Sequence, residues 1–320
     1  MKTGQATGKL LLALLLIATS KVATAQQDID YQVGLAFGQR SIDYDSTRIA
    51  SGSIWADSNG NLRPGFAGGK VKFDFDEVLD TAALNGTLLY KNFYLSVSLE
   101  LALSTEDTGL RVTADPISGP GIPLALDTTT PFELDRIDYG FTVGHRVWNG
   151  LSIFGGYKYT EFKLKATEPN ILLEEVDSKS TEEGIFLGGS YAFRLADAGI
   201  LSFSIGYAYL DLDFSQSNIS RTAPAFAFSF QEYAFTGSST GLSYGVQWTG
   251  DLSGRWAYTL SLKYQDYSSK NDATSQVMLL GENFPPGDPN TPYTSTNVQH
   301  TKIDSDHSDT TVLLGLMYRF

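Results

Sequence analysis

The segment TTVLLGLMYRF, residues 310–320, decides the fold of this chain. Counted back from the carboxyl end, every second residue is apolar: Phe320, Tyr318, Leu316, Leu314 and Val312. The other parity is smaller or more polar: Arg319, Met317, Gly315, Leu313 and Thr311. Successive side chains of a β-strand point to opposite faces. The segment therefore predicts a strand with an aromatic-tipped apolar face, as expected between lipid and a lumen.

The same period-two alternation recurs in nine further segments. Their apolar faces begin at Tyr31, Leu84, Phe93, Ile137, Leu151, Ile185, Leu201, Leu242 and Trp256. Short connections are predicted at 91–92, 149–150, 196–199 and 250–254, and long ones near 46–75, 105–131, 166–182, 215–236 and 269–308. Short turns that alternate with long loops are typical of membrane β-barrels.

Four short turns and five long loops make ten strands, with both ends of the chain on the short-turn side. The sequence therefore predicts an all-β fold, a transmembrane antiparallel up-and-down β-barrel of about ten strands in residues 26–320. Eight or twelve strands are the alternatives, if a long loop hides a hairpin or a weak strand does not form. A soluble β-sandwich would also alternate, but its outward faces would be polar rather than rich in Tyr and Trp.

Residues 1–25 predict a secretory signal peptide. Lys2 and Lys9 supply a positive start, and residues 10–18 form an apolar run too short to span a bilayer. Ala23-Thr24-Ala25 offers a small-x-small cleavage site. A membrane anchor is the alternative interpretation. The absence of cysteine excludes a lipoprotein anchor and any disulfide framework.

The predicted mature chain is strongly acidic. Without the three lysines of the signal peptide its formal net charge is −16, compared with −13 for the whole chain. Nucleic-acid binding needs a basic surface, so we expect no nucleic-acid partner. No long apolar run follows residue 25, which predicts no transmembrane helix. The 17 tyrosines and 19 phenylalanines instead suit aromatic girdles at two membrane interfaces.

Over nearly its whole mature length the chain resembles the Gram-negative outer-membrane β-barrel superfamily. The barrel-assembly machinery reads a carboxyl-terminal signal there, polar-x-Gly-x-x-aromatic-x-aromatic, which Gly315, Tyr318 and Phe320 fit. Leu313 stands where the family prefers a polar residue. The resemblance implies an outer-membrane location, contact with membrane lipid and lipopolysaccharide, and assembly by that machinery. It is compatible with a porin-like or structural role and leaves the activity open, because one fold hosts many activities.

Charged residues on the inward parity of the predicted strands are expected to line the lumen: Arg40, Glu100, Asp138, Arg146, Lys158, Arg194, Lys263 and Arg319. Six are basic and two are acidic, so the lumen would be positive in an acidic chain. Such charges either form a paired network that fills the interior or line a pore that favours anions. About eight strands leave an interior just filled by side chains, and open porins use about 16–18. We therefore expect at most a narrow, weakly anion-preferring channel.

Acidic residues collect where the predicted strands meet the long loops, together with one histidine: Asp43, Asp45, Asp74, Asp76, Asp304, Asp306 and His307. The strands that carry them become neighbours when the barrel closes, so these rim acids are predicted to crowd one side. Their commoner role is solvation and the binding of Ca²⁺ or Mg²⁺, which prefer oxygen ligands, between the rim and lipopolysaccharide. No resident metal site or cofactor is predicted, and no spacing matches an EF-hand loop.

Asp74-Phe75-Asp76 is also similar to the first aspartate pair of omptins, ten-stranded outer-membrane proteases that combine it with an Asp-x-His pair to activate water. The second pair is missing here, because residues 211–213 read Asp-Leu-Asp. His145 lies near a predicted short turn, which leaves His307 as the candidate base. A surface enzyme at the rim, an omptin-like protease or a lipid hydrolase, is therefore an alternative function. A neutral His oriented by an Asp would be its base.

The predicted loops contain apolar stretches, of which Ala223 to Phe235 is the most aromatic. These stretches predict hairpins that extend above the membrane or a lid made of packed loops. Exposed apolar patches also mark interaction surfaces. An adhesin, or a barrel that binds an apolar ligand, is therefore a further alternative.

Overall fold

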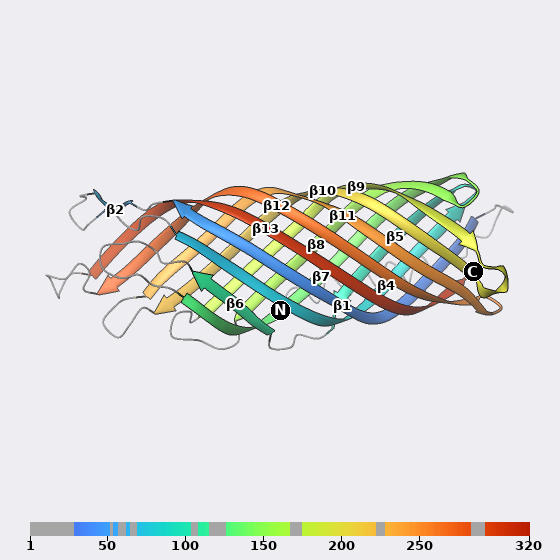
Figure 1. The fold of residues 1–320 in the computed structure, drawn as a ribbon, viewed down its shortest axis with the longest axis horizontal. Coiled ribbons are helices and arrows are strands. Elements are labelled where there is room, and N and C mark those ends of the chain that lie inside the picture. The colour runs from blue at the N-terminus through green and yellow to red at the C-terminus, as the bar shows by residue number, and fades with distance from the viewer. Residues whose placement is uncertain are drawn as a thin grey trace.

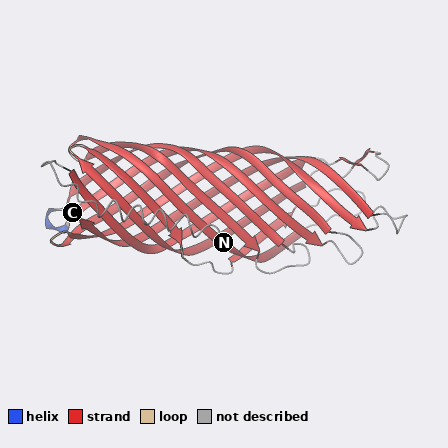
Figure 2. Cartoon of the chain, turned by 180° about the vertical axis from the view of Figure 1, so that it is seen from behind, coloured by secondary structure: helices blue, strands red, loops and turns tan. Residues whose placement is uncertain are grey.

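Ten strands close into one antiparallel barrel, shown from the side in Figure 1 and from behind in Figure 2. The computed structural model describes residues 29–51, 54–56, 62–64, 69–103, 108–114, 126–166, 175–221, 228–282 and 292–320. The wall strands are β1 (Ile29–Ser51), β4 (Gly69–Tyr90), β5 (Phe93–Ala102), β6 (Thr108–Ala114), β7 (Leu126–Trp148), β8 (Leu151–Ala166), β9 (Glu175–Arg194), β10 (Ile200–Arg221), β11 (Phe228–Ser253), β12 (Trp256–Glu282) and β13 (Pro292–Arg319). A small hairpin, β2 (Ile54–Ala56) with β3 (Leu62–Pro64), and the one-turn helix η1 (Ala196–Ala198) complete this part.

The barrel closes where the first and last strands meet. β1 pairs with β13 from Gln32 opposite Arg319 to Ser51 opposite His300. β5 and β6 both lie between β4 and β7, one beyond the other along the barrel, so together they form one of the ten strands of the wall. The predicted ten-stranded up-and-down barrel is therefore confirmed. Within the described residues, no helix has the length and apolar character needed to cross a membrane.

Short turns join the strands at one end of the barrel, here called the turn end: Lys91–Asn92, Asn149–Gly150, Leu195–Gly199 and Gly254–Arg255. Gly150 has φ +78° and Gly254 has φ +58°, a left-handed backbone that glycine adopts readily. The last turn lies at the edge of the predicted range because β11 continues to Ser253. The opposite end, which carries the long connections, is called the loop end.

The strands continue far beyond the apolar segments seen in the sequence. A transmembrane strand needs only about 9–11 residues, whereas β10 has 22 residues and β13 has 28. Both run through segments predicted as long loops, so the predicted loop boundaries are wrong. The barrel instead extends past the predicted membrane as paired strands. The predicted signal peptide, residues 1–25, lies outside the described residues.

Apolar side chains point outward in the half of the barrel near the turn end. This outward band includes Leu35, Phe37, Leu95, Phe141, Val143, Ile153, Ile185, Leu187, Phe203, Ile205, Leu260, Leu262, Leu314 and Leu316, all exposed in the isolated chain. Exposed aromatic residues border it at both margins: Tyr139, Tyr157, Tyr209 and Tyr264 toward the loop end, and Trp148, Tyr191, Trp256 and Phe320 toward the turn end. A band with aromatic margins suits a lipid-facing surface.

In the half near the loop end, the apolar residues change to the other parity of the strands and point inward. On β1, Leu35 and Phe37 point outward, whereas Ile42 farther along is fully buried. Ile42 belongs to an apolar cluster inside the barrel: Ile42, Phe75, Leu79, Leu110, Phe132, Leu134 and Phe162. A second cluster contains Leu212, Phe214, Phe235 and Ile303. Where the outside of the wall meets water rather than lipid, apolar side chains gain more by burial inside the barrel.

Candidate functional site

A layer of buried charged side chains crosses the interior between the two halves. It contains three cations and three carboxylates: Arg40, Arg136, Lys158, Glu100, Asp138 and Asp309. These residues come from the inward parity of β1, β5, β7, β8 and β13. We call this set the charge layer.

Arg40 on β1 is the hub of the charge layer. Its guanidinium forms ion pairs with Glu100 on β5 and Asp138 on β7. Its Nε donates to Thr311 Oγ1 at 2.9 Å and lies 4.0 Å from Asp309 Oδ1. Only 2% of Arg40 is exposed. A charge so deeply buried is tolerated only with opposite charges around it, and the carboxylates supply them.

Arg136 on β7 joins Asp138, which Arg40 also contacts, to Asp309 on β13. Its Nε donates to Asp138 Oδ2 at 2.8 Å, and its Nη2 donates to Asp309 Oδ2 at 2.9 Å. Thr160 Oγ1 donates to Asp138 Oδ1 at 2.7 Å. Arg136 Cζ lies 4.3 Å from the ring centroid of Phe162, a cation–π contact. The charge layer is thereby joined to the apolar interior of the loop half.

Lys158 on β8 extends the network to β12. Its Nζ donates to Tyr267 Oη at 3.2 Å and lies 4.4 Å from the centroid of the same ring. Gln265 Nε2 donates to that hydroxyl at 2.9 Å. Lys158 therefore reaches across the interior to the opposite wall.

The structure brings together four of the eight residues predicted to line the lumen: Arg40, Glu100, Asp138 and Lys158. Lys263 faces a cavity on the turn side of the charge layer. Arg146, Arg194 and Arg319 lie near the turn end, where Arg319 Nη1 pairs with Asp251 Oδ1 at 2.6 Å. The predicted surplus of positive charge is absent from the charge layer, because its three cations are matched in number by three carboxylates.

Two members of the charge layer, Arg136 and Asp309, are not among the residues that the sequence predicts to line the lumen. Both lie at or just beyond the ends of the apolar segments from which strands were inferred. A usable signal exists, since Arg136 keeps the inward parity of Asp138 and Asp309 keeps that of Thr311. Extending the period-two pattern past the apolar residues would have found them.

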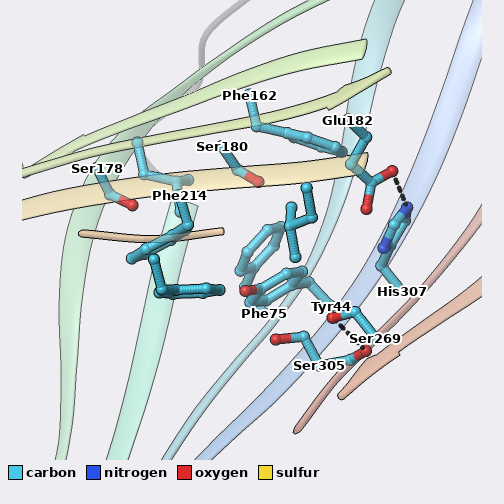
Figure 3. Close-up of a pocket in the computed structure, with 13 residues that line it drawn as sticks. Tyr44, Phe75, Phe162, Ser178, Ser180, Glu182, Phe214, Ser269, Ser305 and His307 are labelled. Carbon is cyan, nitrogen blue, oxygen red and sulfur yellow. Dashed lines mark hydrogen bonds and ion pairs between the residues drawn. The ribbon is translucent and has the colours of Figure 1, made fainter. Parts of the chain in front are cut away.

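A narrow crevice lies on the loop side of the charge layer (Figure 3). Aromatic and hydroxyl side chains surround it: Tyr44, Phe75, Phe162, Phe214, Ser178, Ser180, Ser269 and Ser305. The crevice encloses about 30 Å³, enough for about one or two water molecules.

Glu182 on β9 and His307 on β13 face each other in this crevice (Figure 3). Glu182 Oε2 lies 3.6 Å from His307 Nε2, too far for a good hydrogen bond. Among the described residues neither atom has a hydrogen-bond partner. Burial lowers the pKa of His307, while the charge of Glu182 opposes this shift. A neutral imidazole beside a carboxylate is suited to general-base chemistry.

The rim acids lie on the outer wall, separated by the strands from the crevice. Asp45 stands directly opposite Asp306 on β13 and Asp74 on β4, so three neighbouring strands do bring acids together. Lys72 Nζ contacts Asp45 Oδ2 at 2.6 Å and offsets part of this charge. Asp43, Asp76 and Asp304 share the outward parity.

His307 points inward, so the wall lies between it and Asp74 and Asp76. These described residues do not form the omptin-like arrangement considered from the sequence. Across the described ranges, no group of three or more His, Cys, Asp or Glu side chains is arranged to hold a metal ion. Binding of Ca²⁺ or Mg²⁺ at the rim stays a prediction.

The predicted assembly signal lies beside the closing seam of the barrel. A Cβ on Gly315 would come within 2.7 Å of Ala36 Cβ and 2.9 Å of Thr259 Oγ1, so glycine permits the close approach of three strands. The Tyr318 ring lies 4.8 Å from that of Phe320. Phe320 N donates to Tyr31 O at 3.0 Å, which fixes the end of the chain to β1. Recognition by the barrel-assembly machinery stays a prediction.

The fold and the site together define the class: a closed ten-stranded antiparallel β-barrel, crossed by a charge layer. No protein-family model matches the chain, and no curated protein matches its sequence. The outer membrane protease OmpT from Escherichia coli is similar in structure, with a TM-score of 0.60, 12% identity, and coverage of 94% of this chain and 99% of OmpT. At this identity the likeness concerns the fold alone.

Two further solved structures match more loosely. The translocator domain of the autotransporter NalP from Neisseria meningitidis has a TM-score of 0.39 and 12% identity, covering 99% of this chain and 98% of that domain. The outer membrane protein OprG from Pseudomonas aeruginosa has a TM-score of 0.33 and 14% identity, covering 92% of this chain and 97% of OprG.

Proposed function

We propose that this chain is a structural barrel of a Gram-negative outer membrane, porin-like in architecture but without an open diffusion path. The burial of the charge layer carries the proposal. Arg40, Arg136 and Asp309 each expose 2% or less of their surface, although they project into the middle of the barrel. A water-filled passage beside them would leave such side chains hydrated.

The interior on the loop side supports the same proposal. The two apolar clusters occupy it, and the crevice between them is only about 30 Å³. Cations and carboxylates balance in the charge layer, so the predicted preference for anions has no source there. The outward apolar band suits the membrane, with the turn end toward the periplasm and the loop end outside.

Liposome swelling tests the proposal. Proteoliposomes that contain the refolded mature chain should swell in isotonic arabinose no faster than liposomes without protein. The double variant Arg40→Ala with Asp138→Ala removes the central ion pair and should swell faster. Exchange of the outer-wall residue Lys163 for Ala serves as the control and should leave the rate unchanged. Rapid swelling of the wild-type proteoliposomes would contradict the proposal.

A hydrolase is the second candidate, and the buried Glu182–His307 pair inside the barrel favours it. The two side chains approach to 3.6 Å in a crevice with room for water, so His307 could accept a proton from a water molecule. Cleavage of a mixed library of fluorogenic peptides would support this candidate if Glu182→Gln and His307→Gln both abolish it and Glu161→Gln does not. A wild-type protein that cleaves no peptide argues for the structural role.

A further inference from the structure

A second and larger cavity lies on the turn side of the charge layer. It encloses about 460 Å³, within the 300–1,000 Å³ range of roughly typical small-molecule sites. Glu100, Asp138 and Lys158 of the charge layer form its roof. Many hydroxyl groups lie in its wall beside apolar surface, among them those of Tyr94, Ser98, Ser190, Ser204, Ser243 and Ser261. We call this cavity the turn-side chamber.

The turn-side chamber is closed on one side only. The charge layer seals it toward the loop end, because Arg40, Arg136, Asp138 and Asp309 of that layer are buried and paired with one another. Its wall reaches Tyr94 and Ser202, which lie within three residues of the turns Lys91–Asn92 and Leu195–Gly199. Solutes would therefore enter and leave at the turn end.

Two ammonium groups face the turn-side chamber without a carboxylate partner. Lys263 forms no ion pair in the part of the chain that the structure describes. Lys158 meets the hydroxyl and ring of Tyr267 rather than a carboxylate. The carboxylates in the roof, Glu100 and Asp138, are both engaged by Arg40. The chamber therefore presents positive charge to whatever fills it.

Both positive charges lie beside β12: Lys263 belongs to this strand, and Lys158 reaches it from β8. Lys158 Nζ touches Tyr267 on that strand. Lys263 stands four residues before Tyr267 on the same face, about 13 Å away at about 3.3 Å per residue. This separation suits a ligand with a negative group near one lysine and polar groups that extend toward the other.

An unpaired acceptor lies between the two lysines. Gln265 is 2% exposed and lines the chamber, and its Oε1 has no hydrogen-bond partner among the described residues. Its amide nitrogen is already used by Tyr267 Oη and Ser243 Oγ at 2.9 Å and 3.1 Å. A buried carbonyl oxygen without a donor is costly, and a hydroxyl of a ligand would supply the donor.

We infer that the turn-side chamber binds a small organic anion rich in hydroxyl groups, such as a sugar acid, which enters from the periplasm. Lys263 and Lys158 attract its negative group, Gln265 accepts from one of its hydroxyls, and the serines of the wall bind the others. This inference goes beyond the structural role, since a closed barrel needs no ligand. Binding and transport are separate, because the charge layer ends the chamber.

Titration calorimetry on the refolded mature chain in detergent tests the inference with three matched probes: gluconate, glucose and glucosamine, which are anionic, neutral and cationic. Gluconate should bind at least about tenfold more tightly than glucose, a difference of about 1.4 kcal/mol, and glucosamine should bind most weakly. Lys263→Met should weaken gluconate binding by at least about tenfold on the same scale. Lys270→Met changes the same residue type on the same strand but on the outer face, and should leave it unchanged.

Equal affinity for the three probes, or no heat with any of them, would overturn the inference. Unchanged gluconate binding by Lys263→Met would do the same. Far-ultraviolet circular dichroism on each variant confirms that the barrel has formed, so that lost binding is not lost folding. These outcomes do not depend on the swelling assay, which can succeed or fail separately.

Discussion

Arg40 on β1 and Asp138 on β7 form an ion pair across the inside of the barrel, although β4 and β5 separate their strands in the wall. Ladder hydrogen bonds join only neighbouring strands. The Arg40–Asp138 pair instead joins distant parts of the wall and holds charge where a pore would need water. A barrel closed in this way depends on the pairing of its interior charges as well as on its seam.

Removal of Arg40 should destabilise the barrel strongly. Arg40→Ala leaves Glu100 and Asp138 buried without their main cation, and loss of one partner of a buried ion pair costs about 3–5 kcal/mol. Urea unfolding in detergent, followed by tryptophan fluorescence, measures this loss. Arg111→Ala is the control, because Arg111 pairs with Asp127 at 3.0 Å on an exposed hairpin and such pairs contribute little. Equal unfolding midpoints for the two variants would show that the charge layer does not hold the barrel together.

The reversal of parity along the strands predicts opposite outcomes for two leucines. Leu134→Ala removes a fully buried side chain from the apolar cluster near the loop end and should cost about 2–5 kcal/mol. Leu187→Ala removes a side chain from the outward band, where lipid or detergent fills the space, and should cost much less. The same urea titration compares them. A larger loss for Leu187→Ala would mean that the loop half is not an apolar core.

The strand pattern near the turn end could be predicted from the sequence because lipid enforces it. Leu314, Leu316 and their counterparts must face lipid, so apolar residues recur at period two. The loop half could not be predicted in the same way. There Phe75 faces inward while Asp74 faces water, and a pattern that allows apolar residues only on the outward parity predicts a loop. A continuous period-two pattern with a change of parity is the signal that would have extended the strands.

His307 should make stability depend on pH. Burial lowers its pKa in the folded state, with Glu182 and Asp309 opposing the shift and Arg136 and Lys158 adding to it. The unfolded chain, with an ordinary histidine pKa of about 6.5, then binds the proton more readily. Stability should therefore be full above about pH 6.5 and fall as the pH drops below it. His307→Gln should flatten this slope in urea titrations between about pH 7 and pH 5, and an unchanged slope would contradict the assignment.

Glu161 on the outer wall should set part of the acid limit of stability. Partial burial disfavours its charge, but hydrogen bonds from Lys163, Lys179 and Tyr159 lower its pKa from 4.5 to about 2. A carboxyl group with a lowered pKa stabilises the fold above its unfolded value and loses this effect as the pH falls toward about 2. Glu161→Gln should remove that contribution and reduce the acid dependence, measured by circular dichroism during acid titration. Identical acid titrations of wild type and variant would contradict this role.

The candidate site was predictable in part. Arg40, Glu100, Asp138 and Lys158 could be assigned to the interior because they share the inward parity of clear strands. Their pairing could not be predicted, since it depends on which strands face one another across the barrel. The pairing of Glu182 with His307 was hidden for the same reason, because β9 and β13 are far apart both in the sequence and in the wall.

Current through planar lipid bilayers tests the closed interior most directly. After insertion of the refolded mature chain, we expect no regular current steps in concentrated KCl at either polarity, because the buried charge layer and the apolar clusters leave no continuous water path. The Arg40→Ala, Asp138→Ala double variant should show small steps under the same conditions. Stable, uniform steps from the wild-type chain, comparable with those of an open porin, would contradict the account.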